Sequence, residues 1–492
     1  MDNLENYFCE FRENIIGINQ EFESPYGKKK IIYADWIASG RLYSPIEKAL
    51  IENFGPYVGN THSESSVTGT TMTKAYHKSK KIIKKHVNAS KDDVLIFAGF
   101  GMTAAINKFQ RLLGLKVCEQ LNKYTSIPMN EKPVVFITHM EHHSNHTSWL
   151  ETICDVVIIE PDDNGLVNLN HFDHLLKLYE NRNLKIGSFT ASSNVTGIQP
   201  QYHLMAKMVH EYGGICFIDF AAAAPYIEIN MHPKDPMEKL DAIFFSPHKF
   251  LGGPGTSGVL IFDSKLYNRK IPDHPGGGTV DWTNPWGGHK YIQDIETRED
   301  GGTPGFLQAI KTALAIELKE EMGIRNILDR EHELLEIAFD RFFKIPTLHI
   351  LAQETKERLG IISFYVEDIH YNLIVKLLND LYGIQVRGGC SCAGTYGHYL
   401  LHVDPTRSKR ITDKINHGDL SEKPGWVRLS IHPTMTNEEL NYILNAIDDI
   451  IKNIGEWSKD YYYSSKTNEY YHSLTNGKEY DMIEKLFGMN EK

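Results

Sequence analysis

The chain has 492 residues, of which 41% are hydrophobic and 23% are charged, and its formal net charge is −11 at pH 7. This length exceeds what one compact core accommodates and predicts two or three structural units. An acidic chain is a poor nonspecific nucleic-acid binder, and no apolar run approaches the roughly 20 residues that cross a bilayer, so we expect neither nucleic acid nor a membrane as a partner.

The start of the chain, residues 1–6, is acidic and lacks the apolar core of a signal peptide. Six cysteines in so long a chain do not make a disulfide framework. We therefore expect a cytoplasmic protein with reduced thiols.

Short apolar runs alternate with amphipathic segments between about residues 90 and 262. Their near-continuous apolar character indicates strands buried on both faces, as in a mostly parallel sheet covered by helices. The seven expected strands contain residues 94–97, 134–137, 156–159, 186–189, 215–218, 242–245 and 258–262. Ligands of such sheets bind beyond the carboxyl ends of the strands, where this chain places polar residues.

The pattern changes after about residue 305 and predicts a smaller α+β unit. Helices are expected at 306–322, 330–343, 371–381 and 437–451, and strands at 349–351, 361–366 and 427–431. The tyrosine-rich tail from Glu456 is expected either to pack as an extra helix or to lie on a partner subunit. The predicted parts are an N-terminal segment packing on the small domain (1–40), a large domain (41–300), a small domain (301–455) and a C-terminal extension (456–492).

Lys249 follows an expected strand and precedes a glycine-rich turn. A lysine there can form an imine with an aldehyde cofactor, although a lone lysine is more often a solvated surface charge. Asp219 ends another expected strand and can either cap the next segment of the chain or face a protonated pyridine nitrogen. Together the two residues supply what pyridoxal 5′-phosphate (PLP) requires of a protein.

A glycine-rich turn between a strand and a helix presents free backbone N–H groups to an anion. Gly101, Met102 and Thr103 form such a turn after the first expected strand. Ser246 and His248 can add side-chain donors to the same phosphate.

Four histidines fall within residues 139–146. Imidazoles bind zinc, but the spacing lacks an H-E-x-x-H pattern and has no carboxylate or thiolate partner nearby, so we expect no metal. An imidazole stacked on a flat aromatic cofactor is the favoured interpretation for one of the four.

Taken together, these positions resemble the class V aminotransferase-like group of fold type I PLP enzymes, and most closely the cysteine desulfurases and selenocysteine lyases. The resemblance runs from about residue 33 to 451. The matching motifs, in the family's order, are Glu141-His142-His143, Ser193-Asn194-Val195-Thr196-Gly197, Asp219, Ser246-Pro247-His248-Lys249, Pro275-Gly276-Gly277-Gly278, Asp300-Gly301-Gly302-Thr303-Pro304 and Arg428.

The resemblance implies a large domain with a seven-stranded, mostly parallel sheet and a smaller α+β C-terminal domain. It implies that Lys249 carries PLP, that His142 stacks over the ring, and that Asn194 lies near the phenolate oxygen and the substrate. It also implies that Arg428 binds the substrate carboxylate, and Arg387 is assigned to the same substrate site.

Thr303 is implied to reach the PLP phosphate of the neighbouring subunit. This role implies a homodimer with shared sites.

In one branch of the family a mobile-loop cysteine lies five residues after an arginine, and Arg387 places Cys392 there. A glycine-rich loop can carry a thiolate to a substrate sulfur. The alternatives are a loop cysteine without a role and a C-x-C pair of Cys390 and Cys392 that binds metal or forms a strained disulfide. The implied activity converts L-cysteine to L-alanine and passes sulfur through an enzyme persulfide to an acceptor protein or small thiol.

Three departures from the family pattern bear on the substrate, and two of them, Ala222 and the long insertion, favour an alternative reaction on an amino acid, such as transamination, β-elimination or epimerisation. Ala222 stands where glutamine is common, Met102 stands where a second hydroxyl is common, and residues 394–425 form an insertion that acts as a lid or a docking arm. A non-catalytic scaffold is the remaining alternative, and the retained Lys249, Asp219 and Arg428 argue against it.

Overall fold

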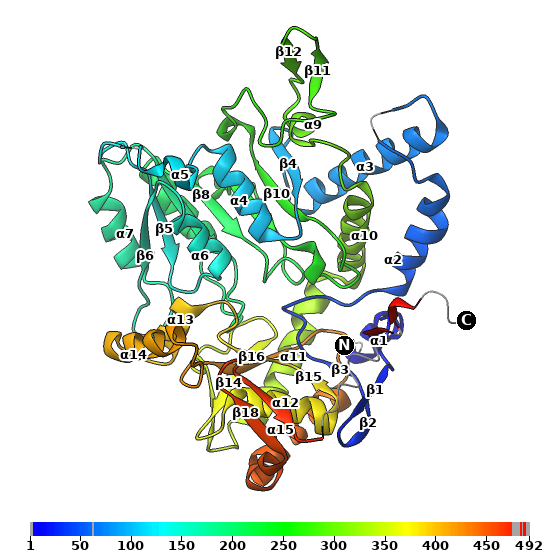
Figure 1. The fold of residues 1–492 in the computed structure, drawn as a ribbon, viewed down its shortest axis with the longest axis vertical. Coiled ribbons are helices and arrows are strands. Elements are labelled where there is room, and N and C mark those ends of the chain that lie inside the picture. The colour runs from blue at the N-terminus through cyan, green and yellow to red at the C-terminus, as the bar shows by residue number, and fades with distance from the viewer. Residues whose placement is uncertain (1–2, 62, 125, 475–482, 485, 489–492) are drawn as a thin grey trace.

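The computed structural model describes residues 3–61, 63–124, 126–474, 483–484 and 486–488. A seven-stranded sheet forms the upper part of the molecule in Figure 1, and a smaller α+β unit lies below it. In the described part of the chain no helix has both the length and the apolar character to cross a bilayer.

The large sheet contains all seven strands that the apolar runs predict. In sheet order they are β4 (Asp93–Ala98), β10 (Gly258–Asp263), β9 (Ala242–Phe245), β8 (Ile215–Asp219), β7 (Lys185–Thr190), β5 (Val134–Thr138) and β6 (Asp155–Ile159). β10 alone runs opposite to the other six strands, so its pairings with β4 and β9 are antiparallel and the other pairings are parallel. The predicted α/β fold with a mostly parallel sheet is therefore confirmed.

Helices cover both faces of this sheet, which is why its strands are apolar throughout. One face buries Phe109 and Phe217, and the other buries Phe136 and Phe189. The helices of this part are α2 (Ser44–Lys48), α3 (Val67–His86), α4 (Met102–Leu112), α5 (Glu119–Asn122), α6 (His143–Leu150), α7 (Leu169–Leu178), α8 (Tyr202–Glu211) and α9 (Ile295–Glu299). Strands β11 (Val280–Thr283) and β12 (His289–Tyr291) form a hairpin that projects from the top of Figure 1.

The small domain contains a four-stranded antiparallel sheet covered by helices. The strands, in sheet order, are β13 (Leu348–Ile350), β14 (Ile361–Val366), β17 (Trp426–Ser430) and β16 (Arg387–Gly389). The helices that cover this sheet are α11 (Ile324–Phe342), α12 (Tyr371–Tyr382) and α15 (Asn437–Trp457). The preceding helix, α10 (Phe306–Met322), packs on α3 and joins the core of the large sheet. Thr436 caps α15 by accepting from the backbone N–H of Glu439, as its T-x-x-E signature predicts.

The N-terminal segment contributes to both apolar cores. Phe8 and Phe11 of α1 (Leu4–Glu13) join the core of the large sheet, whereas Ile32 and Ala34 join the core of the small domain. The remaining N-terminal strands are β1 (Glu21–Ser24), β2 (Gly27–Lys30) and β3 (Ile32–Tyr33), and β3 pairs with β15 (Ile384–Gln385). The boundaries at residues 40, 300 and 455 stay predictions.

Two segments fall outside the simple two-domain pattern. The insertion at 394–425 contains α13 (Gly394–Leu400) and α14 (Pro405–Asn416). Residues 461–472 of the tail form a hairpin of β18 (Tyr461–Ser464) and β19 (Glu469–His472). The tail touches the insertion, since Leu420 N–H donates to Ser465 O at 2.8 Å.

Candidate active site

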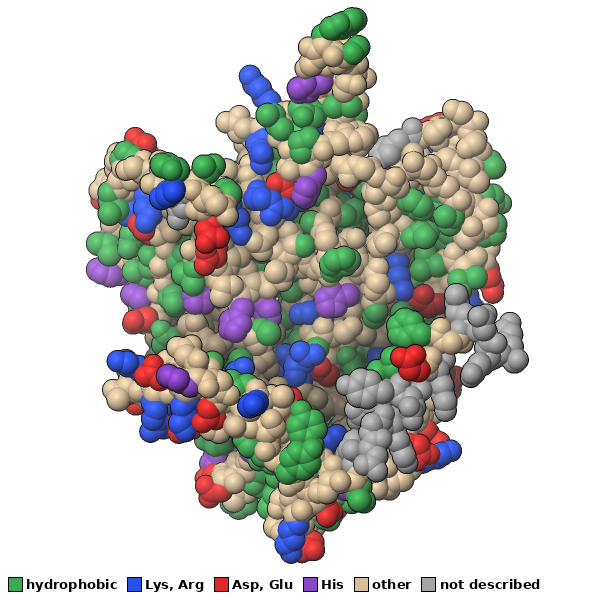
Figure 2. Space-filling view, in the orientation of Figure 1, with side chains coloured by type: hydrophobic (Ala, Val, Ile, Leu, Met, Phe, Trp, Pro, Cys, Tyr) green, Lys and Arg blue, Asp and Glu red, His purple; other side chains and the backbone are tan. Residues whose placement is uncertain are grey.

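A cavity of about 230 Å³ lies where the large and small domains meet. The carboxyl ends of β7, β8 and β9 form one wall, and β16, β17 and the loop after β16 form another. Its lining residues are Ile37, Ala38, Met102, Thr103, His142, Ser144, Thr190, Ser192, Asn194, Asp219, Ala221, Ala222, Ser246, His248, Lys249, Arg387, Ser391, Cys392 and Arg428. Histidine side chains gather across the middle of the face in Figure 2, where the two domains meet.

Lys249 and Asp219 lie on adjacent strand ends. The register of β8 and β9 pairs Asp219 with Phe244, and Lys249 follows in the short turn after β9. Burial lowers the pKa of Lys249 to about 8, and the carboxylate of Asp219 partly offsets this effect. Burial also raises the pKa of Asp219 to about 6. A buried amine and a buried carboxylate therefore face one small cavity.

Replacing Asp219 with asparagine is expected to stabilise the cofactor-free protein at about pH 8. Burial raises the pKa of this carboxyl from 3.8 to about 6, so the folded protein holds the proton more tightly than the unfolded chain. Its contribution to stability is greatest below about pH 4 and falls by about 3 kcal/mol as pH rises to 6. In urea unfolding, the free energy of unfolding of Asp219→Asn should rise relative to that of wild type as pH rises from 4 to 8.

Asp241 provides the matched control with the opposite sign. It is also buried, but hydrogen bonds from His210 and Lys239 outweigh its desolvation and lower its pKa. Asp241→Asn should therefore destabilise the protein at about pH 8. An Asp219→Asn variant that is less stable than wild type at that pH would contradict the prediction.

The turn before α4 forms an anion cradle with the end of β9. Met102 N–H, at the start of this helix, lies 2.8 Å from Ser246 Oγ. A Cβ added at Gly101 would lie 3.0 Å from Ser246 Oγ and 3.6 Å from His248 Nε2, so glycine leaves this space open. Thr103 Oγ1 is 2.6 Å from Ser144 Oγ. A helix start, three hydroxyls and an imidazole thus converge, which fits the phosphate group of PLP.

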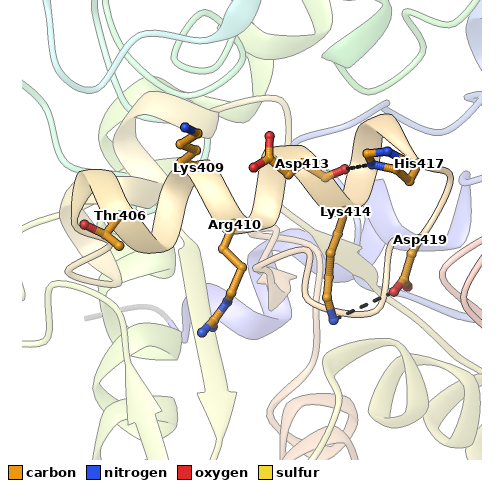
Figure 3. Close-up of a pocket in the computed structure, with 7 residues that line it drawn as sticks. All are labelled: Thr406, Lys409, Arg410, Asp413, Lys414, His417 and Asp419. Atoms are coloured by element: carbon orange, nitrogen blue, oxygen red, sulfur yellow. Dashed lines mark hydrogen bonds and ion pairs between the residues drawn. The ribbon is translucent and has the colours of Figure 1, made fainter.

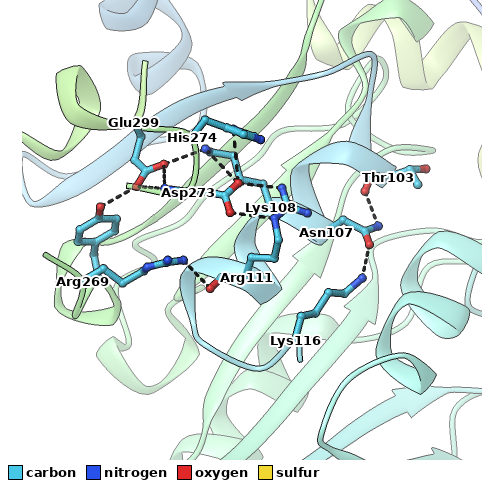
Figure 4. Close-up of polar contacts among 10 residues, drawn as sticks. Thr103, Asn107, Lys108, Arg111, Lys116, Arg269, Asp273, His274 and Glu299 are labelled. Carbon is cyan, nitrogen blue, oxygen red and sulfur yellow. Dashed lines mark hydrogen bonds and ion pairs between the residues drawn. The ribbon is translucent and has the colours of Figure 1, made fainter. Parts of the chain in front are cut away.

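A network of ion pairs holds the other end of α4 in place (Figure 4). Lys108 Nζ donates to Glu299 at 2.8 Å, and Arg111 donates twice to Asp273, at 2.8 Å each. Glu299 ends α9, which leads directly into the segment with Thr303. The network therefore fixes the anion cradle and that segment relative to one another.

His142 caps the start of α6 and lines the cavity. Its Nδ1 accepts from Ser144 N–H at 3.1 Å, and burial lowers its pKa to about 3, so the ring is neutral near pH 7. Glu141 lies beneath this turn and accepts from Thr138 and Asn145. This anchoring fixes the imidazole that the sequence assigns to the cofactor ring.

The other three histidines of the cluster hold other contacts and do not converge. His139 Nε2 bonds Gly165 O, and His143 Nε2 accepts from Gly394 N–H at 2.9 Å. His146 Nδ1 lies 3.2 Å from Thr395 Oγ1. The last two contacts dock α13 of the insertion on the large domain, which the sequence did not predict.

Asn194 and Arg428 lie side by side at the back of the cavity. Arg428 Nη1 donates to Asn194 O at 3.2 Å, and Asn194 Nδ2 donates to Ser391 O at 2.7 Å. In the described structure Asn194 Oδ1 and Arg428 Nε are buried without a hydrogen-bond partner. Buried polar atoms are normally paired, so these two suit a ligand with both donor and acceptor groups.

Cys392 lines the cavity, whereas Cys390 packs against an apolar cluster that contains Trp426. Ser391 and Cys392 both have positive φ, at 52° and 57°, a conformation that non-glycine residues adopt rarely. Cys392 O accepts from His143 N–H at 2.7 Å. The tight turn thereby directs Cys392 rather than Cys390 to the cavity.

Thr303 does not line this cavity; its exposed hydroxyl donates to Asn60 Oδ1 at 3.3 Å. Sequence reasoning also missed Asp35, which bonds to both Arg387 and Arg428. The only sequence signal was an acidic residue directly after the apolar residues 31–34. A larger depression of about 490 Å³ on α14 (Figure 3) is lined by residues of the insertion alone and shares none with the cavity.

The model of the aminotransferase class-V family matches residues 32–443. A probable cysteine desulfurase of Staphylococcus epidermidis is 28% identical over 375 residues, which is 75% of this chain and 85% of that protein. A second, from Halalkalibacterium halodurans, is 26% identical over 367 residues, or 74% of this chain and 84% of that protein.

Solved structures share the fold. An apo cysteine desulfurase of Thermococcus onnurineus NA1 superposes with a TM-score of 0.72 at 22% identity, covering 90% of this chain and 98% of that one. The cysteine desulfurase CsdA of Escherichia coli gives 0.69 at 21% identity over the same shares. Because the family model spans most of the sequence and the site lies within it, the chain belongs to the aminotransferase class-V family.

Proposed function

We propose that this protein is a PLP-dependent cysteine desulfurase, which converts L-cysteine to L-alanine and receives the sulfur on Cys392. The supporting observation is the convergence of Lys249, Asp219, Arg428 and Cys392 on one cavity. The names of the relatives agree with this proposal. A cytoplasmic location, which fits reduced thiols, stays a prediction.

The residues present fit PLP. Lys249 would hold the aldehyde, Asp219 the ring nitrogen and His142 one face of the ring, while the cradle of Gly101, Met102, Thr103, Ser246 and His248 would hold the phosphate. Bound PLP supplies an electron sink that makes the Cα proton of an amino acid acidic.

The protein's own groups would do the rest. Arg387 and Arg428 bind the substrate carboxylate as planar cationic forks. Lys249, whose lowered pKa increases the fraction of neutral amine, moves the Cα proton. Cys392 thiolate attacks the substrate sulfur; the S–S bond forms as the Cβ–S bond breaks, and the electron pair returns to carbon. Protonation at Cβ and return of a proton from Lys249 to Cα complete L-alanine, and the persulfide passes to an acceptor protein or small thiol.

Product identification tests this reaction directly. Purified, PLP-loaded protein incubated with L-cysteine should yield alanine and, with a thiol reductant, sulfide in equal amounts. Pyruvate with sulfide would indicate β-elimination, and a keto acid without sulfide would indicate amino transfer. A colourless protein that binds no PLP would favour a non-catalytic scaffold.

One observation favours the second candidate, another reaction of the class V family. Ala222 lines the cavity and brings no hydrogen-bond donor to the cofactor's phenolate oxygen. A reaction that does not rely on that donor therefore stays open, with aminotransferase, lyase and epimerase activities as candidates. The choice between cysteine and selenocysteine as the substrate is open in the same way.

The protein is expected to be a homodimer in which Thr303 completes the partner's phosphate site. Thr303→Ala should raise the dissociation constant of PLP roughly tenfold, because one hydrogen bond to a charged phosphate is worth about 1.5 kcal/mol. Sedimentation should give twice the chain mass of 56.2 kDa. Thr412→Ala, which removes an exposed hydroxyl on α14, serves as the control. A monomer, or unchanged PLP affinity, would rule out the shared site.

A further inference from the structure

Asp35 lies between the two arginines assigned to the substrate carboxylate. Its Oδ1 accepts from Arg428 Nη2 at 2.8 Å, and its Oδ2 accepts from Arg387 Nε at 3.0 Å. Asp35 is 9% exposed and Arg428 is 3% exposed, so this pair is largely shielded from water. Both oxygens of one carboxylate are thus used on two cationic side chains from adjacent strands.

The backbone around Asp35 is fixed by the small domain. Ala34 N–H donates to Gln385 O at 2.9 Å, and Ser430 N–H donates to Ala34 O at 2.8 Å. The next residue, Trp36, stacks on the buried ring of His432, with ring centroids 3.9 Å apart. This segment therefore holds the carboxylate at a set position beside β16 and β17.

Asp35 contacts the arginines from outside the cavity. Both Arg387 and Arg428 line the cavity, and Asp35 does not. Arg428 keeps one unpaired, buried donor, Nε, while its two terminal nitrogens donate to Asn194 and Asp35. The side chain of Arg387 is 51% exposed, and the ion pair with Asp35 is the contact that holds its flexible stem at the cavity.

Charge counting gives the second argument. Two guanidinium groups carry two positive charges, and Asp35 cancels one of them. The remaining single charge matches one substrate carboxylate. A net charge of two would instead favour a ligand with two carboxylates.

We propose that Asp35 is a positioning residue that orients Arg387 and Arg428 and sets their net charge for a substrate with a single carboxylate. This inference rests on the proposed function in one respect, namely that these two arginines bind the substrate carboxylate. It does not depend on the reaction that the bound substrate then undergoes.

The test measures binding rather than turnover. PLP-loaded wild type and Asp35→Asn are titrated with L-alanine, with ethylamine, which lacks the carboxylate, and with L-aspartate, which has two. The absorbance change of the cofactor gives each dissociation constant. We expect Asp35→Asn to raise the dissociation constant of L-alanine roughly tenfold, because the charge-assisted hydrogen bonds from Asp35 orient the two guanidinium groups. The dissociation constant of ethylamine should change less than about twofold, and the preference of the site for L-aspartate over L-alanine should rise.

Two further variants separate positioning from folding. Asp35→Glu keeps the charge and should recover part of the affinity for L-alanine. Asp380→Asn removes another buried small-domain carboxylate, which accepts from Tyr461 outside the cavity, and should leave all three constants unchanged. Circular dichroism shows whether each variant is folded before the titration.

The outcomes distinguish the two proposals. If wild type binds L-alanine no better than ethylamine, the arginines do not bind a carboxylate, and both the site assignment and the role of Asp35 are wrong. If wild type discriminates and a folded Asp35→Asn discriminates equally well, the role of Asp35 alone is overturned. If Asp35→Asn weakened the binding of L-alanine and of ethylamine equally, the role of Asp35 would likewise be overturned, because such a result would indicate general damage to the site.

Discussion

Lys249→Ala is expected to abolish turnover of L-cysteine, by at least about 10³-fold, and to leave the purified protein without its yellow colour. In the proposed reaction Lys249 binds the cofactor aldehyde covalently and then moves the Cα proton. Its loss therefore removes both the covalent anchor of the cofactor and the acid–base catalyst. The side chain is buried beside Asp219, and no other lysine lines the cavity in the described structure. Alanine formation and the absorbance of bound PLP are the two measurements.

Two controls sharpen this result. Lys249→Arg keeps a cation at the same place but cannot form the bond, so it should be as inactive as alanine. Lys319 is also buried, and its Nζ donates to Ala224 O at 2.7 Å, away from the cavity. Lys319→Met should lose stability yet stay yellow. Substantial activity in Lys249→Ala would remove the basis for the proposed function.

The large sheet is predictable because its strands are buried on both faces. Runs such as 134–137 and 242–245 are apolar without alternation, and helices cover both sides of each. The grouping of Asp219 and Lys249 follows from the same rule, since carboxyl ends of parallel strands meet at one edge. Strong local patterns therefore locate most of the site.

The features that the sequence does not reveal depend on contacts between distant segments. Asp35 reaches Arg428 across 393 positions, and His143 reaches Gly394 across 251. No periodic pattern and no motif spacing in a single sequence indicates either contact. The hairpin at 461–472 is likewise fixed by long-range contacts, such as the bond from Asn468 Nδ2 to Tyr371 OH at 2.7 Å.

Cys392→Ala is expected to reduce alanine formation from L-cysteine by at least about 10²-fold, while the absorbance of bound PLP and the mass in sedimentation match those of wild type. Cys392 lines the cavity, and Arg428, with which it interacts electrostatically, lies on the same wall. The thiolate is the form of a cysteine that attacks sulfur. Removing it leaves cofactor and substrate binding in place but no acceptor for the sulfur.

Cys390→Ala is the matched control, because it is the same substitution two residues away in the same loop. Cys390 packs against the cluster around Trp426 instead of lining the cavity, so its loss should change alanine formation less than about threefold.

Wild type treated with L-cysteine and then alkylated should carry one extra sulfur atom on the peptide with Cys392, and Cys390→Ala should carry it too. Full activity in Cys392→Ala would exclude the persulfide step, whereas loss of activity in Cys390→Ala alone would transfer the sulfur-accepting role to that residue. We do not expect this second outcome, because the turn with positive φ at Ser391 and Cys392 places Cys392 at the cavity and Cys390 against the cluster around Trp426.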